Sequence, residues 1–146
     1  MATRALYTFT GFPETPVLHL YLHHDGYPTG AACRFAAALR HHPGATAFLS
    51  AFRSTQPAAD VLAGSEQAAD AEYRYVVELL PGPDARLQLQ GWRRLPGANS
   101  WTPRCGPMEL AVFIERFLPG GLPGAEPAVL WSPSSAGQQP RGERKG

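Results

Sequence analysis

The sequence has few of the features that mark a protein for an oxidising environment or a membrane. Its 146 residues include only two cysteines, Cys33 and Cys105, too few for a disulfide scaffold. No stretch approaches the run of about 18 apolar residues that a transmembrane helix needs. The first residues contain no apolar segment of the kind found in secretory signals. We therefore expect a cytoplasmic protein that does not bind membranes.

Strong charge of one sign is also absent. Thirteen basic and twelve acidic residues leave a formal net charge of +1, so the chain as a whole has no strong field to attract a polyanion. Twelve of the basic residues are arginine, a bias that is typical of high-GC bacterial or phage genomes. This charge balance does not favour nucleic acid as the partner.

Motifs that are typical of enzymes are missing as well. The sequence has no glycine-rich phosphate loop, no HExxH and no GxSxG, and its cysteines lack the spacing of a structural zinc site. We expect no cofactor and no bound metal. These absences favour a non-catalytic protein.

Alternating side chains predict a first β-hairpin. Residues 5–10 and 17–23 alternate with the period of two that strands show, and a proline-containing loop of about six residues separates them. In the second segment the leucines share one face, and the other face carries His19, Tyr21 and His23.

A second hairpin is predicted further along the chain. Residues 72–80 alternate over their whole length, and residues 85–93 turn Leu87 and Leu89 to one side. The segment Pro81-Gly82-Pro83-Asp84 between them is a turn sequence. We expect both hairpins to be antiparallel, with one apolar face each.

Three segments have helical periodicity. Residues 29–41, 46–55 and 107–118 each place apolar side chains at spacings of three and four, which predicts amphipathic helices. Residues 57–71 and 94–106 show no clear period and are expected to be loops.

These elements predict an α+β domain over residues 1–118, in the order β-β-α-α-β-β-α. The two hairpins would form a four-stranded antiparallel sheet, with about three helices on its apolar face. Residues 119–146 hold five prolines and six glycines, and we expect them to form a mobile tail. The predicted core consists of Tyr7, Phe9, Leu20, Phe35, Leu39, Phe48, Phe52, Tyr75, Val77, Leu89 and Ile114.

The segment His23-His24-Asp25-Gly26 is the densest candidate for chemistry. A carboxylate that orients an imidazole makes a general base, so His23, His24 and Asp25 are the candidate catalytic residues. The alternative is structural: Asp25-Gly26 turns the chain, Asp25 caps the following helix, and Gly26 has a positive φ. We favour the structural interpretation, because acid–base sites usually gather residues from distant elements.

The polar side of the predicted sheet is a second candidate site. Polar and aromatic side chains there would form a platform of the type that stacks single-stranded bases, although no RNA-binding motif is present. Its members are expected to be His19, Tyr21, His23, Arg74, Arg86, Gln88 and Gln90. Exposed tryptophan and arginine are typical of protein interfaces. The predicted binding residues are His19, Tyr21, His23, His24, Tyr27, Arg74, Trp92 and Arg93.

Three segments together resemble a known group of sequences. They are TRALYTF at residues 3–9, YLHHDGYP at residues 21–28 and EYRY at residues 72–75. In this respect the chain resembles a family of small proteins from phages, prophages and other bacterial mobile elements, over roughly residues 3–93. Leu22 stands where that pattern has lysine. The resemblance implies a phage-related accessory or anti-defence protein, and it brings no enzymatic activity with it.

Two functions follow as expectations. The first is a non-catalytic interaction protein, including an anti-CRISPR-like inhibitor, that occupies a surface of a host or phage protein; a homodimer is compatible with it. The second is a small enzyme or nucleic-acid-acting protein that uses His23, His24 and Asp25. They differ in whether His24 and Asp25 converge with another polar group in a concave pocket.

Overall fold

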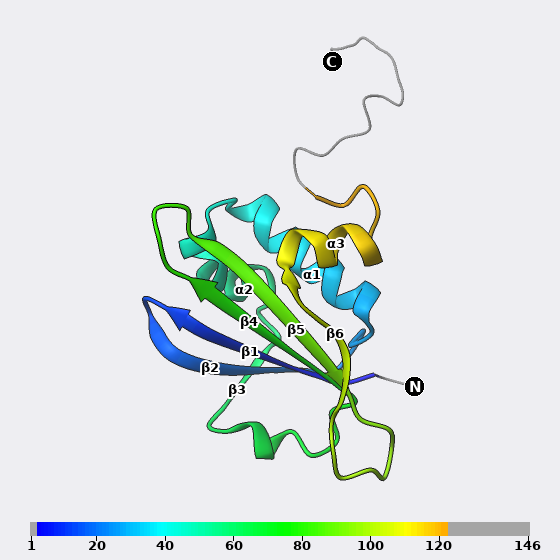
Figure 1. Cartoon of the computed structure of the whole chain (residues 1–146). Helices are drawn as coiled ribbons and strands as arrows, with labels where there is room; N and C mark the ends of the chain where they lie inside the picture. Colours follow the sequence, from blue (N-terminus) through cyan, green and yellow to red (C-terminus); the bar gives the residue numbers. More distant parts are fainter. Residues whose placement is uncertain (1–2, 123–146) are drawn as a thin grey trace.

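The computed structural model describes residues 3–122, so the tail expected at residues 119–146 lies almost wholly outside the described residues. The described part is an α+β fold in which a sheet carries helices on one side (Figure 1). The strands are β1 (Ala5–Phe12), β2 (Thr15–Leu22), β3 (Asp60–Leu62), β4 (Tyr73–Leu80), β5 (Arg86–Arg93) and β6 (Thr102–Glu109). The helices are α1 (Pro28–His41), α2 (Phe48–Thr55) and α3 (Leu110–Phe117), and short 3₁₀ turns cover Ala45–Ala47 and Ser65–Gln67.

The sheet is mixed, not the four-stranded antiparallel sheet that the hairpin pattern predicts. Its six described strands lie in the order β3-β2-β1-β4-β5-β6, and β1 and β4 pair in parallel at its centre, with Tyr7 opposite Tyr75. Both expected hairpins are present and antiparallel. The prediction was wrong about how they join, because α1 and α2 form a crossover that is long enough to return β4 in the direction of β1.

Two strands lie where the sequence predicts loops. The three-residue β3 pairs with the end of β2, and β6 adds to the outer edge of β5. The β6 sequence contains Pro103 and Pro107, and proline is tolerated in a strand that has a neighbour on one side only. Because β6 runs to Glu109, the last helix begins at Leu110 and not at residue 107 as expected.

The first hairpin is tighter than its prolines suggest. Its strands are longer than predicted, and a turn at Pro13 and Glu14 replaces the expected loop of about six residues. Pro16 therefore lies within β2. It is tolerated there because β3 pairs only with residues 19–21, so this part of β2 is an edge.

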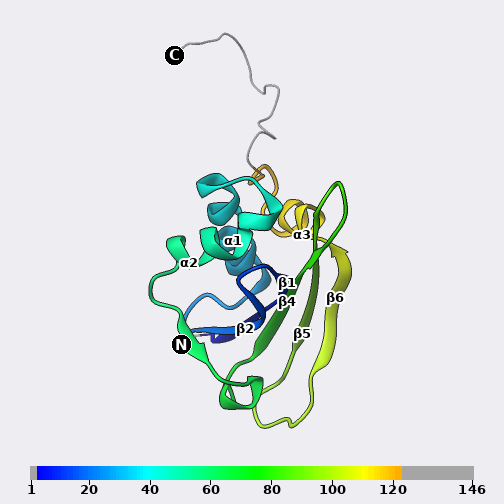
Figure 2. The same ribbon diagram turned by 90° about the vertical axis from the view of Figure 1, so that its left-hand side faces the viewer.

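The core lies between the sheet and the helices, which share one side of it (Figure 2). Aromatic rings fill its centre: Tyr7 stacks on Tyr75 with ring centroids 5.3 Å apart, and Phe35 and Phe52 pack around Tyr7. Every predicted core residue is buried except Leu39, which is half-buried at the margin of the cluster. The period-two strand faces and the helical stripes therefore identified the core correctly.

No helix among residues 3–122 is both long enough and apolar enough to cross a membrane.

A buried hydrogen bond from Tyr75 ties the centre of the sheet to the turn before α1. Its hydroxyl donates to the Gly26 carbonyl at 2.7 Å. We expect Tyr75→Phe to lower the free energy of unfolding by about 1–3 kcal/mol, because the buried carbonyl loses its donor. Urea denaturation measures this loss. The matched control is Tyr73→Phe on the same strand, where a loss of less than about 1 kcal/mol is expected; equal losses in the two variants would contradict the role of the bond.

Candidate functional site

Arg34 of α1 stabilises the turn between β2 and α1 through hydrogen bonds. Arg34 donates from its guanidinium to the main-chain carbonyls of His24 at 2.7 Å and of Asp25 at 2.8 Å. The same side chain donates to the Tyr7 hydroxyl at 3.3 Å and to the Gln56 side chain at 3.2 Å. Arg34 thereby connects the turn to the core and to the end of α2.

The structure corrects how Asp25 and Gly26 make this turn. Asp25, not Gly26, has the positive φ, at 54°. No side chain caps α1, so the expected capping role of the Asp25 carboxylate was wrong. Gly26 is required for another reason: a Cβ there would lie 2.9 Å from the Cβ of Ala5 and 2.9 Å from the carbonyl oxygen of Thr3. The turn is shaped by close backbone approach and by Arg34.

The candidate catalytic residues do not assemble into one site. The His23 ring pairs with Asp60 of β3 at 3.0 Å, and both side chains are about half exposed or more. Asp25 and Tyr27 line a pocket of about 580 Å³ beside α1, but His24 is not among its lining residues. Within residues 3–122 no three histidine, cysteine, aspartate or glutamate side chains gather in a way that could hold a metal ion.

The predicted binding residues fall on two sides of the sheet. The strand register places Tyr21, Leu6, Arg74 and Trp92 opposite one another across four strands. His19 belongs to the next row on the same face, which is the face without helices. We call this surface the open face. Gln88, Gln90 and Arg86 follow Trp92 along β5 at alternating positions, so the polar platform expected from the sequence lies on this face.

Two members of the predicted binding set belong to the helix side. Arg93 pairs with Tyr73 in the strand register, and its guanidinium lies over that ring at 5.6 Å. Tyr27 is exposed and contacts the same ring at 6.1 Å. Tyr27 and Arg93 are therefore neighbours, but they do not share a surface with His19, Arg74 and Trp92.

One end of the open face is covered by the segments that flank it. Leu6 and Tyr21 are buried there in a small second cluster with Ala68, Ala71 and the half-buried Trp101. The Tyr21 hydroxyl donates to the carboxylate of Asp70.

Arg94 fixes this cover. It stacks on the Trp101 ring at 4.2 Å and donates to the carbonyls of Ala68 and Ala71 at 2.9 Å each. Sequence reasoning missed Asp60 and Asp70, because the alanine-rich segment before β4 has no periodicity that could assign them.

Arg74 is the charged residue at the centre of the uncovered part of the open face. Its Nε is buried and has no hydrogen-bond partner in the described structure, and its guanidinium carbon lies 5.9 Å from the centre of the Trp92 ring. Burial lowers the pKa of Arg74. In the part of the chain that the structure describes, no acidic side chain forms an ion pair with it. Arg74 is thus a partly desolvated cation with unused donor capacity.

His19 lies next to this cation. Its Nδ1 is 2.9 Å from the Thr8 hydroxyl on β1. Burial lowers the pKa of His19, and the positive charge of Arg74 lowers it further, against a smaller opposing effect of Glu66. The ring is therefore held in its neutral form, as an uncharged hydrogen-bonding group beside the arginine.

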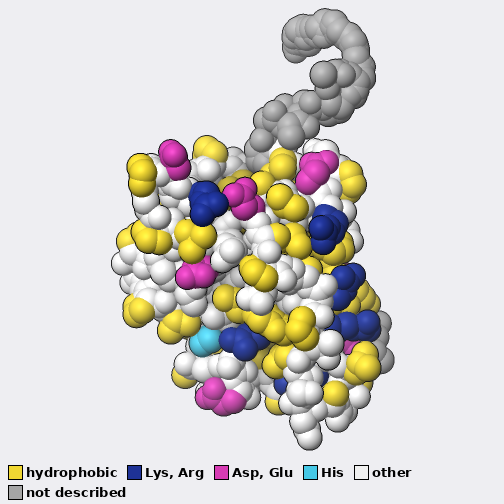
Figure 3. All heavy atoms as spheres, viewed as in Figure 1, with side chains coloured by type: hydrophobic (Ala, Val, Ile, Leu, Met, Phe, Trp, Pro, Cys, Tyr) yellow, Lys and Arg dark blue, Asp and Glu magenta, His cyan; other side chains and the backbone are white. Residues whose placement is uncertain are grey.

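The open face carries both signs of charge. It faces the reader in Figure 3, where a histidine and a basic side chain lie side by side, with hydrophobic side chains next to them. Arg86 on the same face is neutralised by Glu109 at 3.2 Å, and Glu78 lies between these residues and Arg74 along the sheet.

Neither a protein-family model, nor a curated protein, nor a solved structure matches this chain.

We expect Arg34 to matter for stability and the Asp25 carboxylate not to matter. Arg34→Met removes the donors to both turn carbonyls, and we expect it to cost about 2 kcal/mol, the scale of hydrogen bonds from a charged group. Asp25→Asn keeps a residue that tolerates a positive φ, so a change below about 0.5 kcal/mol is expected. Urea denaturation measures both variants, with Arg40→Met on the exposed side of α1 as the control. A large loss in Asp25→Asn would restore a structural role for the carboxylate.

The depressed pKa of His19 predicts that acid weakens the fold. Between the folded-state pKa and the ordinary value of 6.5, the unfolded chain binds the proton more readily than the folded chain. The stability that the neutral His19 ring contributes is fully present above pH 6.5, and it is lost as the pH falls through and below that value. Urea denaturation from about pH 7.5 to about pH 5 measures this dependence. It should become shallower in His19→Gln; equal profiles for wild type and His19→Gln would contradict the assignment.

Proposed function

We propose that this protein is a non-catalytic binding protein that receives a partner protein on its open face, with Arg74 as the anchor. The observation that carries the proposal is the state of Arg74. An arginine that is partly desolvated, lacks an acidic partner and lies against a tryptophan is costly in the free protein, and a carboxylate or a set of carbonyl oxygens from a partner would relieve that cost.

The composition of the open face fits a protein interface. Arginine and tryptophan are enriched among the residues that dominate binding energy, and Arg74 and Trp92 are adjacent here. Neutral His19 and Gln90 offer polar atoms around them, and Val76 adds apolar surface in the same row. This mixture of an arginine–aromatic centre with polar surroundings is common in interfaces.

Charge argues against nucleic acid as the partner of this face. Polyanion binding requires several unpaired cations along a track, because affinity rises with the number of phosphates contacted. Arg86 is already paired with Glu109, and Glu78 adds an opposing charge nearby. Arg74 alone suits one carboxylate of a folded partner better than it suits a chain of phosphates.

The resemblance to proteins of phages and other mobile elements supports a host protein or complex as the partner. A small protein that acts by covering such a surface needs no catalytic group, and His23, His24 and Asp25 do not assemble one. An anti-defence role, including inhibition of a CRISPR complex, is the specific form of this proposal.

The proposal is tested by comparing matched arginine variants. Tagged full-length protein is used to capture partners from bacterial lysate, and the candidate partner is then purified and titrated directly. We expect Arg74→Gln and Trp92→Ala each to weaken binding by about 2 kcal/mol or more, as interface anchors do. The control Arg40→Gln, on the helix side, should bind like wild type.

Two outcomes would contradict the proposal. One is a partner whose affinity is equal for wild type and Arg74→Gln. The other is tight, salt-dependent binding of a single-stranded oligonucleotide that the Arg74→Gln variant loses, which would make this face a nucleic-acid site. Thermal melts of each variant show whether the fold is retained.

A further inference from the structure

Strand β4 presents a positive, an apolar and a negative side chain in one line on the open face. Arg74, Val76 and Glu78 stand at alternate positions of β4, and alternate side chains of a strand point to the same face. At about 3.3 Å per residue, Arg74 and Glu78 lie about 13 Å apart, too far to pair, with Val76 at the midpoint. Within residues 3–122 neither charge forms an ion pair with any other residue. The strand therefore carries two unpaired, opposite charges at equal distances from Val76.

The row of side chains through Val76 is uncharged across five strands. His19 is a neutral member of this row, because burial and the charge of Arg74 lower its pKa. The strand register places in the row Leu62 of β3, His19 of β2, Thr8 of β1, Val76 of β4 and Gln90 of β5. A row of this kind can lie against a copy of itself without the repulsion that like charges produce.

We propose that two copies of this chain pack their open faces together about a two-fold axis at Val76. An axis that lies between the two sheets, at right angles to β4, reverses the direction of that strand in the second copy. Arg74 of each copy then lies opposite Glu78 of the other copy, since both residues are equally far from the axis. Each copy thus supplies the carboxylate that Arg74 lacks in the single chain, and the uncharged rows meet at the centre.

The segments that cover one end of the open face fit the same arrangement. They lie over Leu6 and Tyr21, which belong to the row of Arg74. The axis places them over the opposite row of the other copy, where β1 and β2 carry Thr10 and Val17. These two side chains are small, so they leave room for the covering segments, and the exposed Val17 offers them apolar surface.

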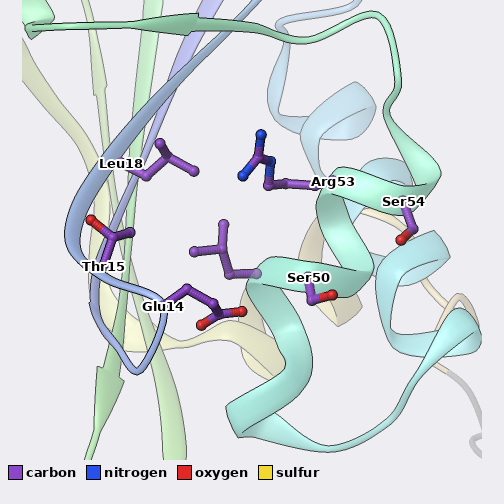
Figure 4. Close-up of a pocket in the computed structure, with 7 residues that line it drawn as sticks. Glu14, Thr15, Leu18, Ser50, Arg53 and Ser54 are labelled. Carbon is purple, nitrogen blue, oxygen red and sulfur yellow. The ribbon is translucent and has the colours of Figure 1, made fainter.

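A pocket on the helix side shows how Arg74 differs from an exposed arginine. This pocket of about 530 Å³, between the β1–β2 hairpin and α2, has Glu14 and Arg53 at its opposite ends (Figure 4). Both side chains are exposed, so water already solvates them and a second copy would gain little by pairing them. The buried Nε of Arg74 lacks that solvation, and a carboxylate opposite its guanidinium offsets the loss.

The size of the open face predicts a weak dimer. Five strands and three rows of side chains give a footprint of about 24 Å by about 20 Å, or roughly 500 Å² on each copy. Stable interfaces bury about 800 Å² on each partner, so this interface lies at the lower end of the range. We expect a dimer that dissociates at low protein concentration.

This inference goes beyond the proposed function, because it requires no protein other than the chain itself. Both use Arg74, so a partner protein that binds the open face would compete with the second copy. The dimer is then the form in which the free protein keeps its open face covered.

Charge reversal tests the arrangement in the full-length protein. Sedimentation velocity from about 5 to about 500 μM measures the equilibrium between monomer and dimer. We expect wild type to become dimeric as its concentration rises. Arg74→Glu and Glu78→Arg should each weaken the dimer at least roughly tenfold, because like charges then face each other across the axis. An equimolar mixture of the two variants should associate again, since each acidic position of one variant then meets a basic position of the other.

The variants are compared with a charge reversal outside the open face. Arg40→Glu, on the exposed side of α1, should dimerise as wild type does. Glu78 is exposed, so Glu78→Arg tests the contact without disturbing the core. The proposal is overturned by wild type that stays monomeric at every concentration, or by Glu78→Arg that dimerises as strongly as wild type. A mixture that stays monomeric, when thermal melts show both variants folded, would overturn it as well.

Failure of the dimer and failure of the proposed function are distinguishable. Monomeric wild type whose capture of a partner depends on Arg74 would overturn only the dimer. A wild-type dimer, together with a partner that binds Arg74→Gln as well as wild type, would overturn only the proposed function.

Discussion

The parallel pairing of β1 with β4 is the constraint on which the rest of the molecule depends. It stacks Tyr7 on Tyr75 in the centre of the core and lets the Tyr75 hydroxyl reach the Gly26 carbonyl. On the other face the same register brings Arg74 beside Leu6 and, one row on, Val76 beside Thr8. Without that pairing the two hairpins would be separate units that expose their apolar faces, since an isolated hairpin is marginally stable. The core, the turn before α1 and the open face are therefore consequences of one strand contact.

Local patterns in the sequence predicted the features that depend on neighbouring residues. Alternation identified both hairpins, helical spacing identified α1 and α2, and the apolar stripes identified the core, including Phe35 and Val77. The features that were predicted wrongly depend on long-range contacts or on only a few residues. Whether two hairpins join in parallel depends on the path of the crossover, and β6 is hidden by prolines that an edge strand tolerates. The candidate site shows the same division: alternation placed His19 and Arg74 on one face, but no local signal told that Asp60 would pair with His23.

The arginines of the described residues differ in the way their donors are satisfied. Arg34 and Arg94 donate hydrogen bonds to main-chain carbonyls and so hold segments of the chain in place. Arg86 is paired with a carboxylate at the surface, where such a pair contributes little. Arg74 differs from all of these, because its Nε is buried without a hydrogen-bond partner and no acidic side chain within residues 3–122 pairs with it.

The edges of the sheet limit how this protein can meet other chains. At one edge β6 contains Pro103 and Pro107, which have no N–H to donate to an added strand. At the other edge β3 is only three residues long, and the part of β2 that it leaves uncovered contains Pro16. A partner that tried to extend the sheet would find interrupted ladders on both sides. The same interruptions oppose edge-to-edge stacking of copies into fibres.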